Sequence, residues 1–89
     1  MICINGHDEL SVRAQVGVDL TAAKMHGAWL GGAILSTSKL EETDLTEASG
    51  VGATFDEVRA HSAIFAYADL AGATFARAWL DYADFSGAL

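Results

Sequence analysis

Proline is absent from this 89-residue sequence, and cysteine occurs once, at Cys3. A single cysteine permits no internal disulfide, which is typical of a reducing cytoplasm. No apolar run approaches the roughly 18 residues of a membrane-spanning helix, and the first residues lack the basic charge of a secretion signal. Basic residues are also few: 5 Lys and Arg stand against 12 Asp and Glu, which gives a net charge of −7. Because nucleic acids and anionic membranes are bound through basic patches, we expect a cytoplasmic protein that binds neither.

What the sequence does contain is a five-residue period. Large apolar residues fill twelve of the fourteen positions read in steps of five from Leu20 to Phe85, and Ala fills eleven of the fifteen read from Val18 to Ala88. On an α-helix, five residues advance about 500°, so these positions would be spread around the helix. On a flat strand, an odd period would send successive pairs to opposite faces. The period therefore predicts a chain that turns in every repeat and points both sets of residues into one interior.

Stretches such as 68–72 (Ala-Asp-Leu-Ala-Gly) and 83–87 (Ala-Asp-Phe-Ser-Gly) resemble the pentapeptide-repeat family, whose signature is A-(D/N)-(L/F)-X-X. The resemblance covers residues 18–89 and implies an all-β fold, a right-handed quadrilateral β-helix with twenty residues per coil and about four coils. Residues 1–17 keep the register poorly, and we expect a degenerate first coil or an N-terminal cap there. Gly50 and Ala60 interrupt the large central residues, so we expect thin places in the middle coil, with either local softness or a compensating shift.

Residues twenty apart should stack on such a fold, so the outward columns can be read from the sequence. The columns with opposite charges, or with a cation over an aromatic ring, are Asp19–Lys39–Arg59–Trp79, Glu41–His61–Asp81, Lys24–Asp44 and Glu57–Arg77. They predict ion pairs for Asp19–Lys39, Lys24–Asp44 and Glu57–Arg77, and a cation–π contact for Arg59–Trp79. The simplest interpretation is that these ladders stabilise stacked strands.

Acidic residues gather along one part of the predicted rod. This candidate acidic recognition edge consists of Glu41, Glu42, Asp44, Glu47, Asp81 and Asp84. Two interpretations are open: a solvated face that keeps an apolar rod soluble, or a surface that binds a partner. Some pentapeptide-repeat proteins resemble duplex DNA and bind bacterial type II topoisomerases such as DNA gyrase. The resemblance therefore implies an alternative function, a DNA-mimicking regulator, although this chain has fewer coils than those relatives.

The last repeats stay in register to Leu89, and we expect an open coil end there. Trp79, Tyr82 and Phe85 lie on that terminal coil and form a candidate self-association end, because exposed aromatic side chains are favoured binding anchors. We expect a homodimer through this end, or docking on a partner domain.

Catalytic and metal sites have little support in the sequence. Cys3 and His7 lack the second pair that a zinc site needs, and His7-Asp8-Glu9 falls in the predicted cap. Glu41, His61 and Asp81 would lie on a flat wall without a pocket to hold a substrate. We therefore expect no catalytic residue, metal or cofactor. The leading prediction is a non-catalytic protein-interaction or scaffold module that presents flat acidic walls to a protein partner of unknown identity.

Overall fold

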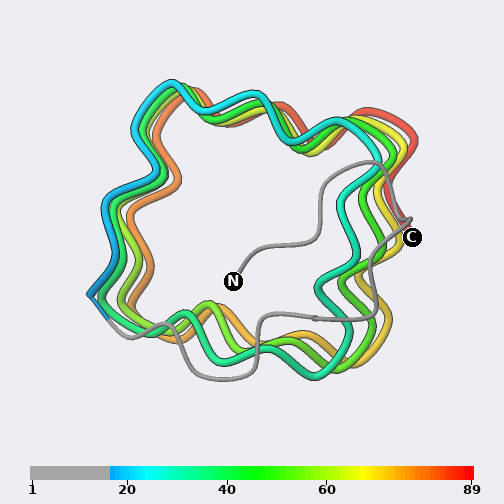
Figure 1. Cartoon of the computed structure of the whole chain (residues 1–89), viewed down its shortest axis with the longest axis horizontal. Helices are drawn as coiled ribbons and strands as arrows, with labels where there is room; N and C mark the ends of the chain where they lie inside the picture. The colour runs from blue at the N-terminus through cyan, green and yellow to red at the C-terminus, as the bar shows by residue number, and fades with distance from the viewer. Residues whose placement is uncertain (1–16) are drawn as a thin grey trace.

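A computed structural model of the chain describes residues 17–89, which form a coil with a repeat of twenty residues. Within this range the backbone consists of turns and isolated parallel bridges, without a helix or a continuous strand. The bridges fall into four columns, which define side 1 (Asp19–Lys39–Arg59–Trp79), side 2 (Lys24–Asp44–Ile64–Asp84), side 3 (Trp29–Ser49–Asp69) and side 4 (Ile34–Thr54–Thr74). Seen end on, the chain follows a four-cornered path whose successive turns lie over one another (Figure 1). The predicted stacking of residues twenty apart is confirmed.

Every repeat is closed by the same tight turn. The carbonyl of the central apolar residue accepts a hydrogen bond from the N–H three residues later, as Leu20 does from Ala23. The residue two positions after the centre has φ between 56° and 75° at all fifteen positions from Gly17 to Gly87, six of them Gly and nine not. A positive φ at the third position is what a type II turn requires. A left-handed residue in each repeat therefore produces the turning that the period predicts.

Backbone hydrogen bonds hold successive turns of the coil together. The central N–H and the N–H two residues later donate to the following turn, as Leu20 does to Lys39 and Ala22 does to Glu41. The N–H just before the centre donates to the preceding turn, as Lys39 does to Val18. With the bond that closes the tight turn, four of the five N–H groups of an inner repeat have backbone partners. The fifth N–H, one residue after the centre, is available to side chains.

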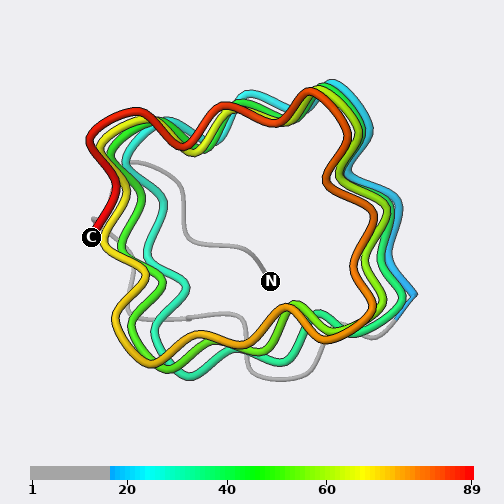
Figure 2. The ribbon, with the colours of Figure 1, turned by 180° about the vertical axis from the view of Figure 1, so that it is seen from behind.

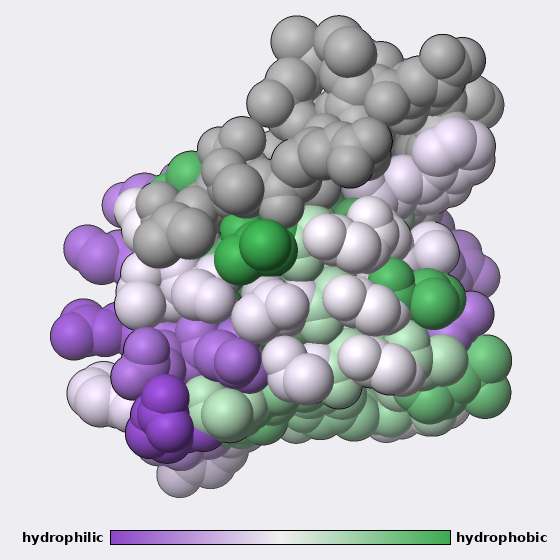
Figure 3. All heavy atoms as spheres, turned by 90° about the horizontal axis from the view of Figure 1, so that it is seen from below, coloured by the Kyte–Doolittle hydropathy of each residue, from purple (hydrophilic) through white to green (hydrophobic). Residues whose placement is uncertain are grey.

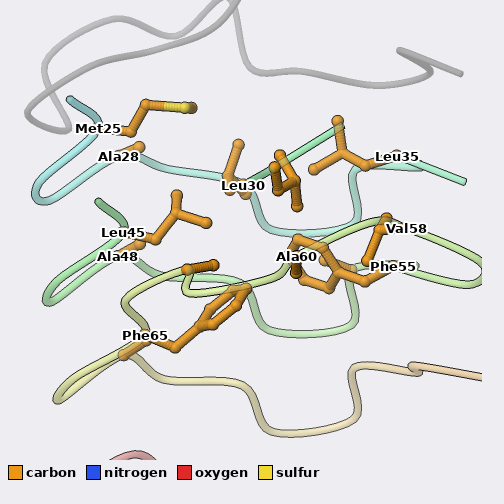
Figure 4. Packing of buried hydrophobic residues seen from close by; sticks show 14 of the residues in the cluster. Met25, Ala28, Leu30, Leu35, Leu45, Ala48, Phe55, Val58, Ala60 and Phe65 are labelled. Carbon is orange, nitrogen blue, oxygen red and sulfur yellow. The ribbon is translucent and has the colours of Figure 1, made fainter. Parts of the chain in front are cut away.

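The interior is filled by the residues that the period selects, and side chains from neighbouring turns meet there (Figure 4). Phe55 and Phe65 are buried and meet edge to face, with ring centroids 5.8 Å apart. Phe55 stacks on Phe75, and Phe65 stacks on Phe85, each at 4.9 Å. Each fully buried Leu or Phe contributes roughly 1.5–3 kcal/mol. These aromatic stacks join successive turns through the core as well as through the backbone.

The space beside Gly50 is filled from other turns, which agrees with the compensating shift that was one of the two expected outcomes at Gly50 and Ala60. Ala60 is fully buried. A Cβ atom at Gly50 would lie 3.1 Å from Cδ2 of Leu70 and 3.7 Å from Cε2 of Phe55. The small residue leaves room for a side chain from the next turn and for a neighbouring ring. Residue size along the sequence could not reveal this, because the volume is supplied from other turns.

Two buried polar side chains replace Ala on the inner wall, and each bonds to the first described turn. The hydroxyl of Thr43 donates to the carbonyl of Leu20 at 2.7 Å, and Ser38 Oγ accepts from the N–H of Val18 at 3.2 Å.

Within residues 17–89, no helix has the length and hydropathy needed to cross a membrane. The predicted cap at 1–17 lies, except for Gly17, outside the described residues.

Candidate interaction surfaces

The predicted acidic edge divides into separate groups on the coil. Glu42 donates its N–H to the carbonyl of His61, so the column Glu41–His61–Asp81 lies at the corner between sides 1 and 2. The column of side 2 places Ile64 between Asp44 and Asp84. The turn that carries His61 and Ile64 therefore separates the acids of the earlier turn from Asp81 and Asp84.

Two acids of this edge close their own turns. Asp44 Oδ1 accepts the N–H of Thr46 at 3.0 Å and its hydroxyl at 2.6 Å. Asp84 Oδ1 accepts the N–H of Ser86 at 2.9 Å and its hydroxyl at 2.6 Å. The N–H in each pair is the one that the backbone leaves without a partner. These side-chain and backbone hydrogen bonds lower the pKa of both carboxyls below the ordinary value of 3.8. Asp44 and Asp84 are therefore structural residues of the turn.

A third acid of the edge, Glu47, lies at the next corner and forms an ion pair with His26, Oε1 to Nε2 at 2.8 Å. Glu41, Glu42 and Asp81 make no side-chain hydrogen bond or ion pair with any residue in the described range. These three carboxylates are therefore the members of the acidic edge that are available to bind a partner.

His61 does not bridge the two carboxylates between which it is stacked. Its ring instead meets Tyr82 edge to face, with centroids 5.4 Å apart. Residues 17–89 contain no ion pair from His61 to Glu41 or Asp81. In this column, His61 is therefore held by an aromatic contact with Tyr82 and not by its acidic neighbours.

The remaining ladders are partly as predicted. The Arg59 guanidinium lies 5.0 Å from the centroid of the Trp79 ring, which confirms the cation–π contact. Arg77 Nε donates to Glu57 Oε2 at 3.2 Å, which confirms that ion pair. Within the described range, Asp19 with Lys39 and Lys24 with Asp44 form no direct ion pair, although each cation still attracts its carboxylate electrostatically. Asp19 Oδ1 accepts from the N–H and hydroxyl of Thr21 instead, just as Asp44 does from Thr46.

An open groove of about 660 Å³ lies on side 1 and the adjoining corner, and the sequence analysis did not identify it. Its lining consists of Thr37, Lys39, Glu57, Arg59, Arg77 and Trp79. The separate columns are visible in the sequence, but their meeting in one groove depends on how two neighbouring columns are set around a corner.

The candidate self-association end is exposed in the structure. Trp79 is 60% exposed, Tyr82 85% and Phe85 36%. In Figure 2 the last turn, orange to red, lies in front with no chain over it. Figure 3 shows hydrophobic atoms along much of the edge farthest from the grey residues, with hydrophilic atoms at its left end. Within residues 17–89, the N–H groups of Phe75, Leu80 and Phe85 make no backbone hydrogen bond, whereas the matching groups of earlier turns do. The three predicted aromatic residues therefore lie at or beside an unpaired edge.

The described range contains no group of three His, Cys, Asp or Glu side chains that could hold a metal ion. Cys3 and the His7-Asp8-Glu9 cluster lie outside the described residues.

Comparison with known proteins gives a match to one family model and to several solved structures, among them two pentapeptide repeat proteins. The family model described as pentapeptide repeats (8 copies) matches residues 68–89. The chain is similar to HetL, a pentapeptide repeat protein involved in heterocyst differentiation regulation from the cyanobacterium Nostoc sp. strain PCC 7120. The identity is 29% and the TM-score 0.51, over 84% of this chain and 39% of HetL. It also matches Rfr23 of the cyanobacterium Cyanothece 51142 at 25% identity and a TM-score of 0.48, over 88% of this chain and 57% of Rfr23. A comparison with curated proteins gave no match.

Proposed function

Because this chain belongs to the pentapeptide-repeat family, whose members are right-handed β-helices and generally protein-interaction modules, we propose that it is a non-catalytic interaction module. Its rigid outer walls would bind a protein partner. We also propose that the fold of the chain is a right-handed quadrilateral β-helix of about four coils. The chain spans 39% of HetL, so the regulatory role of HetL is not carried over.

The observation that carries this proposal is the outward placement of large aromatic side chains on a coil whose interior is filled by other apolar residues. Tyr67, Trp79 and Tyr82 are 67%, 60% and 85% exposed, although the interior readily takes up Phe rings. Aromatic side chains of this kind dominate the binding energy of protein interfaces. An interior closed by stacked turns supplies rigidity, which lowers the entropy lost when a partner binds.

A binding experiment tests this proposal. The purified chain serves as bait, each captured protein is purified, and its affinity for the bait is measured. We expect a partner whose affinity falls in the variant Tyr67→Ser/Trp79→Ser/Tyr82→Ser, while circular dichroism shows an unchanged fold. The matched control is Val51→Ser on another corner, an exposed apolar residue that should leave the affinity unchanged. A full affinity in the aromatic variant would contradict the proposal.

A DNA-mimicking regulator of a bacterial type II topoisomerase is the second candidate. It is supported by three carboxylates at one corner, Glu41, Glu42 and Asp81, which have no side-chain partner among residues 17–89. A gyrase supercoiling assay tests it, and inhibition should be lost in Glu41→Gln/Glu42→Gln/Asp81→Asn. The control Asp19→Asn/Asp56→Asn/Asp69→Asn removes the same charge elsewhere, and Asn keeps the Oδ1 that accepts a backbone N–H at each position. No inhibition by the unaltered chain at micromolar concentration would dismiss this candidate.

We also propose that the open coil end binds a second copy of the chain. Trp79, Tyr82 and Phe85 would supply the contact. The N–H groups of the last turn that have no backbone partner in the described part of the chain would pair with backbone carbonyls of the second copy. Unpaired edges of this kind readily add another chain.

A further inference from the structure

We propose that the groove formed by Lys39, Arg59, Arg77 and Trp79, here called the basic groove, binds an acidic peptide segment of a protein partner. This inference rests on the proposed interaction function and assigns the chemistry of one contact. Neither the family match nor the similar structures assign a ligand to this groove.

Positive charge is concentrated at the basic groove, although the whole molecule is acidic. The chain carries a net charge of −7, yet three of the four Lys and Arg residues in the described range line this one groove. The fourth, Lys24, lies on side 2. A cluster of cations on an acidic protein attracts anions locally, because charges more than about 8 Å away are largely screened at physiological salt.

The cations of the groove are held in place but remain able to bind. Arg59 lies over the Trp79 ring at 5.0 Å, which fixes the guanidinium without neutralising it. Arg77 uses Nε for Glu57, and its side chain is still 75% exposed. Lys39 forms no direct ion pair with any residue of the described range, and its electrostatic interaction with Asp19 leaves its ammonium donors available. A guanidinium presents five N–H donors in a plane, so both arginines retain donors that fit a carboxylate.

The shape of the groove suits an extended peptide. Lys39, Arg59 and Trp79 occupy successive turns of side 1, and adjacent rungs of such a stack are about 4.8 Å apart. Side chains on the same face of an extended peptide recur about every 7 Å, so two carboxylates can reach the two cations of this column. The volume of about 660 Å³ is in the usual range for ligand sites and far exceeds that of one inorganic anion. The open Trp79 end offers a flat apolar surface to the aliphatic part of a Glu side chain.

A peptide fits this groove better than a nucleic acid. Glu57 lines the groove itself, and Asp19 stands at the foot of the same column. These carboxylates and the overall charge repel a continuous polyphosphate, which needs an extended basic surface. A short segment with a few carboxylates can make the local contacts without extending into the acidic surroundings.

Fluorescence titration tests the inference. The variant Trp29→Phe leaves Trp79 as the only tryptophan, and the probe is the peptide acetyl-Glu-Asp-Glu-Asp-Glu-amide. We expect saturable binding that changes the Trp79 emission and weakens as salt is raised from about 0.05 M to about 0.5 M. The uncharged peptide acetyl-Gln-Asn-Gln-Asn-Gln-amide should not bind.

Matched variants show whether the groove is the site. Lys39→Gln/Arg59→Gln should weaken binding about 10-fold, because two charge pairs are lost. Lys24→Gln removes a cation outside the groove and should leave the affinity unchanged. Calorimetry repeats both measurements, because loss of the Arg59 contact itself alters Trp79 emission.

Three results would overturn the inference: no binding of the acidic peptide, an equal loss in Lys24→Gln, or tighter binding of a thymidine oligonucleotide. If the peptide does not bind but a partner is still captured through the exposed aromatic residues, the inference about the groove fails and the interaction function stands. If the peptide binds while no partner with a measurable affinity is captured, the proposed interaction function fails and the groove stands as a peptide site.

Discussion

Single residues of this chain have roles that depend on their place within the repeat. An Asp just before the central residue accepts the one N–H that the backbone leaves free, as Asp19, Asp44, Asp69 and Asp84 do. The Asp in the sequence signature is thus explained by the local chemistry of the turn. The outward acids divide accordingly into those that close turns and those, such as Glu41, that remain open to solvent and partners.

The turn-closing carboxylates make stability depend on pH. The pKa of Asp19, Asp44 and Asp84 is lowered below 3.8 in the folded chain, first by the side-chain hydrogen bond and then by the backbone N–H. A lowered folded pKa gives stability that is fully present above the unfolded pKa and is lost as pH falls through the folded pKa. We therefore expect the melting temperature to hold from about pH 7 to about pH 5 and to fall below about pH 4.

The triple variant Asp19→Asn/Asp44→Asn/Asp84→Asn keeps the accepting Oδ1 and removes the titration. Its melting temperature, followed by circular dichroism, should fall less between about pH 5 and about pH 3 than that of the unaltered chain. Glu41→Gln, which removes a carboxylate without a hydrogen bond, is the control. Equal slopes for the triple variant and the unaltered chain would show that these hydrogen bonds do not cause the pH dependence.

The packing at Gly50 gives a second prediction at this scale. Gly50→Ala should lower the free energy of unfolding by about 1–3 kcal/mol through overpacking against Leu70, less about 0.4–1 kcal/mol gained from a stiffer unfolded chain. In the background Leu70→Ala the contact at 3.1 Å disappears, so the same substitution should no longer destabilise. Urea denaturation of the four proteins in this double-mutant cycle measures the coupling. Additive effects would mean that Leu70 does not occupy the space beside Gly50.

At the scale of the element, the repeat is a tight turn with one left-handed residue. Glycine fills this position at the corner between sides 3 and 4, where Gly32, Gly52 and Gly72 stack. Elsewhere nine residues with side chains adopt the same φ, at a cost of about 1–2 kcal/mol each. Stacking of the coil overrides this local preference, which explains why glycine alone does not mark the turns in the sequence.

Gly52→Ala tests the cost of the left-handed position. A Cβ atom at Gly52 would meet nothing within 4 Å, so any loss of stability comes from its φ of 71°. We expect the free energy of unfolding to fall by about 1 kcal/mol. Gly31→Ala, the residue before the left-handed one at the preceding turn of the same corner, has only an ordinary contact at 3.7 Å and should be neutral or slightly stabilising. Chemical denaturation compares the two, and equal stabilities would contradict the role given to φ.

At the scale of the whole molecule, the coil is a stack that gains stability from each neighbouring turn. Inner turns are covered on both sides, whereas the last turn leaves Phe75 and Leu80 only partly buried and Phe85 36% exposed. The last turn therefore combines exposed apolar area with N–H groups that have no backbone partner within residues 17–89, as the proposed self-association requires.

Self-association should show as a concentration-dependent mass. Light scattering after size exclusion should give a dimer at tens of micromolar and a monomer for Tyr82→Lys/Phe85→Lys, because two charges at the contact disfavour its burial. Val51→Lys, at an exposed apolar residue on an earlier turn, is the control and should remain dimeric. A monomeric unaltered chain at that concentration would rule out this role for the end.

The sequence by itself determined the repeat and the inward residues, because a five-residue period places Leu20 and Met25 identically in successive repeats. Through its resemblance to the pentapeptide-repeat family, the sequence implied that residues twenty apart stack, as the bridges show. It also predicted the contacts of Arg59 with Trp79 and of Glu57 with Arg77, since both pairs lie within single columns. Only the tertiary structure decided how neighbouring columns and turns meet. In the folded chain, Asp44 accepts a hydrogen bond within its own turn, and Leu70 occupies the space beside Gly50. Residues of two neighbouring columns together line the basic groove. These outcomes depend on side-chain reach across a corner or between turns, and a linear period does not contain those distances.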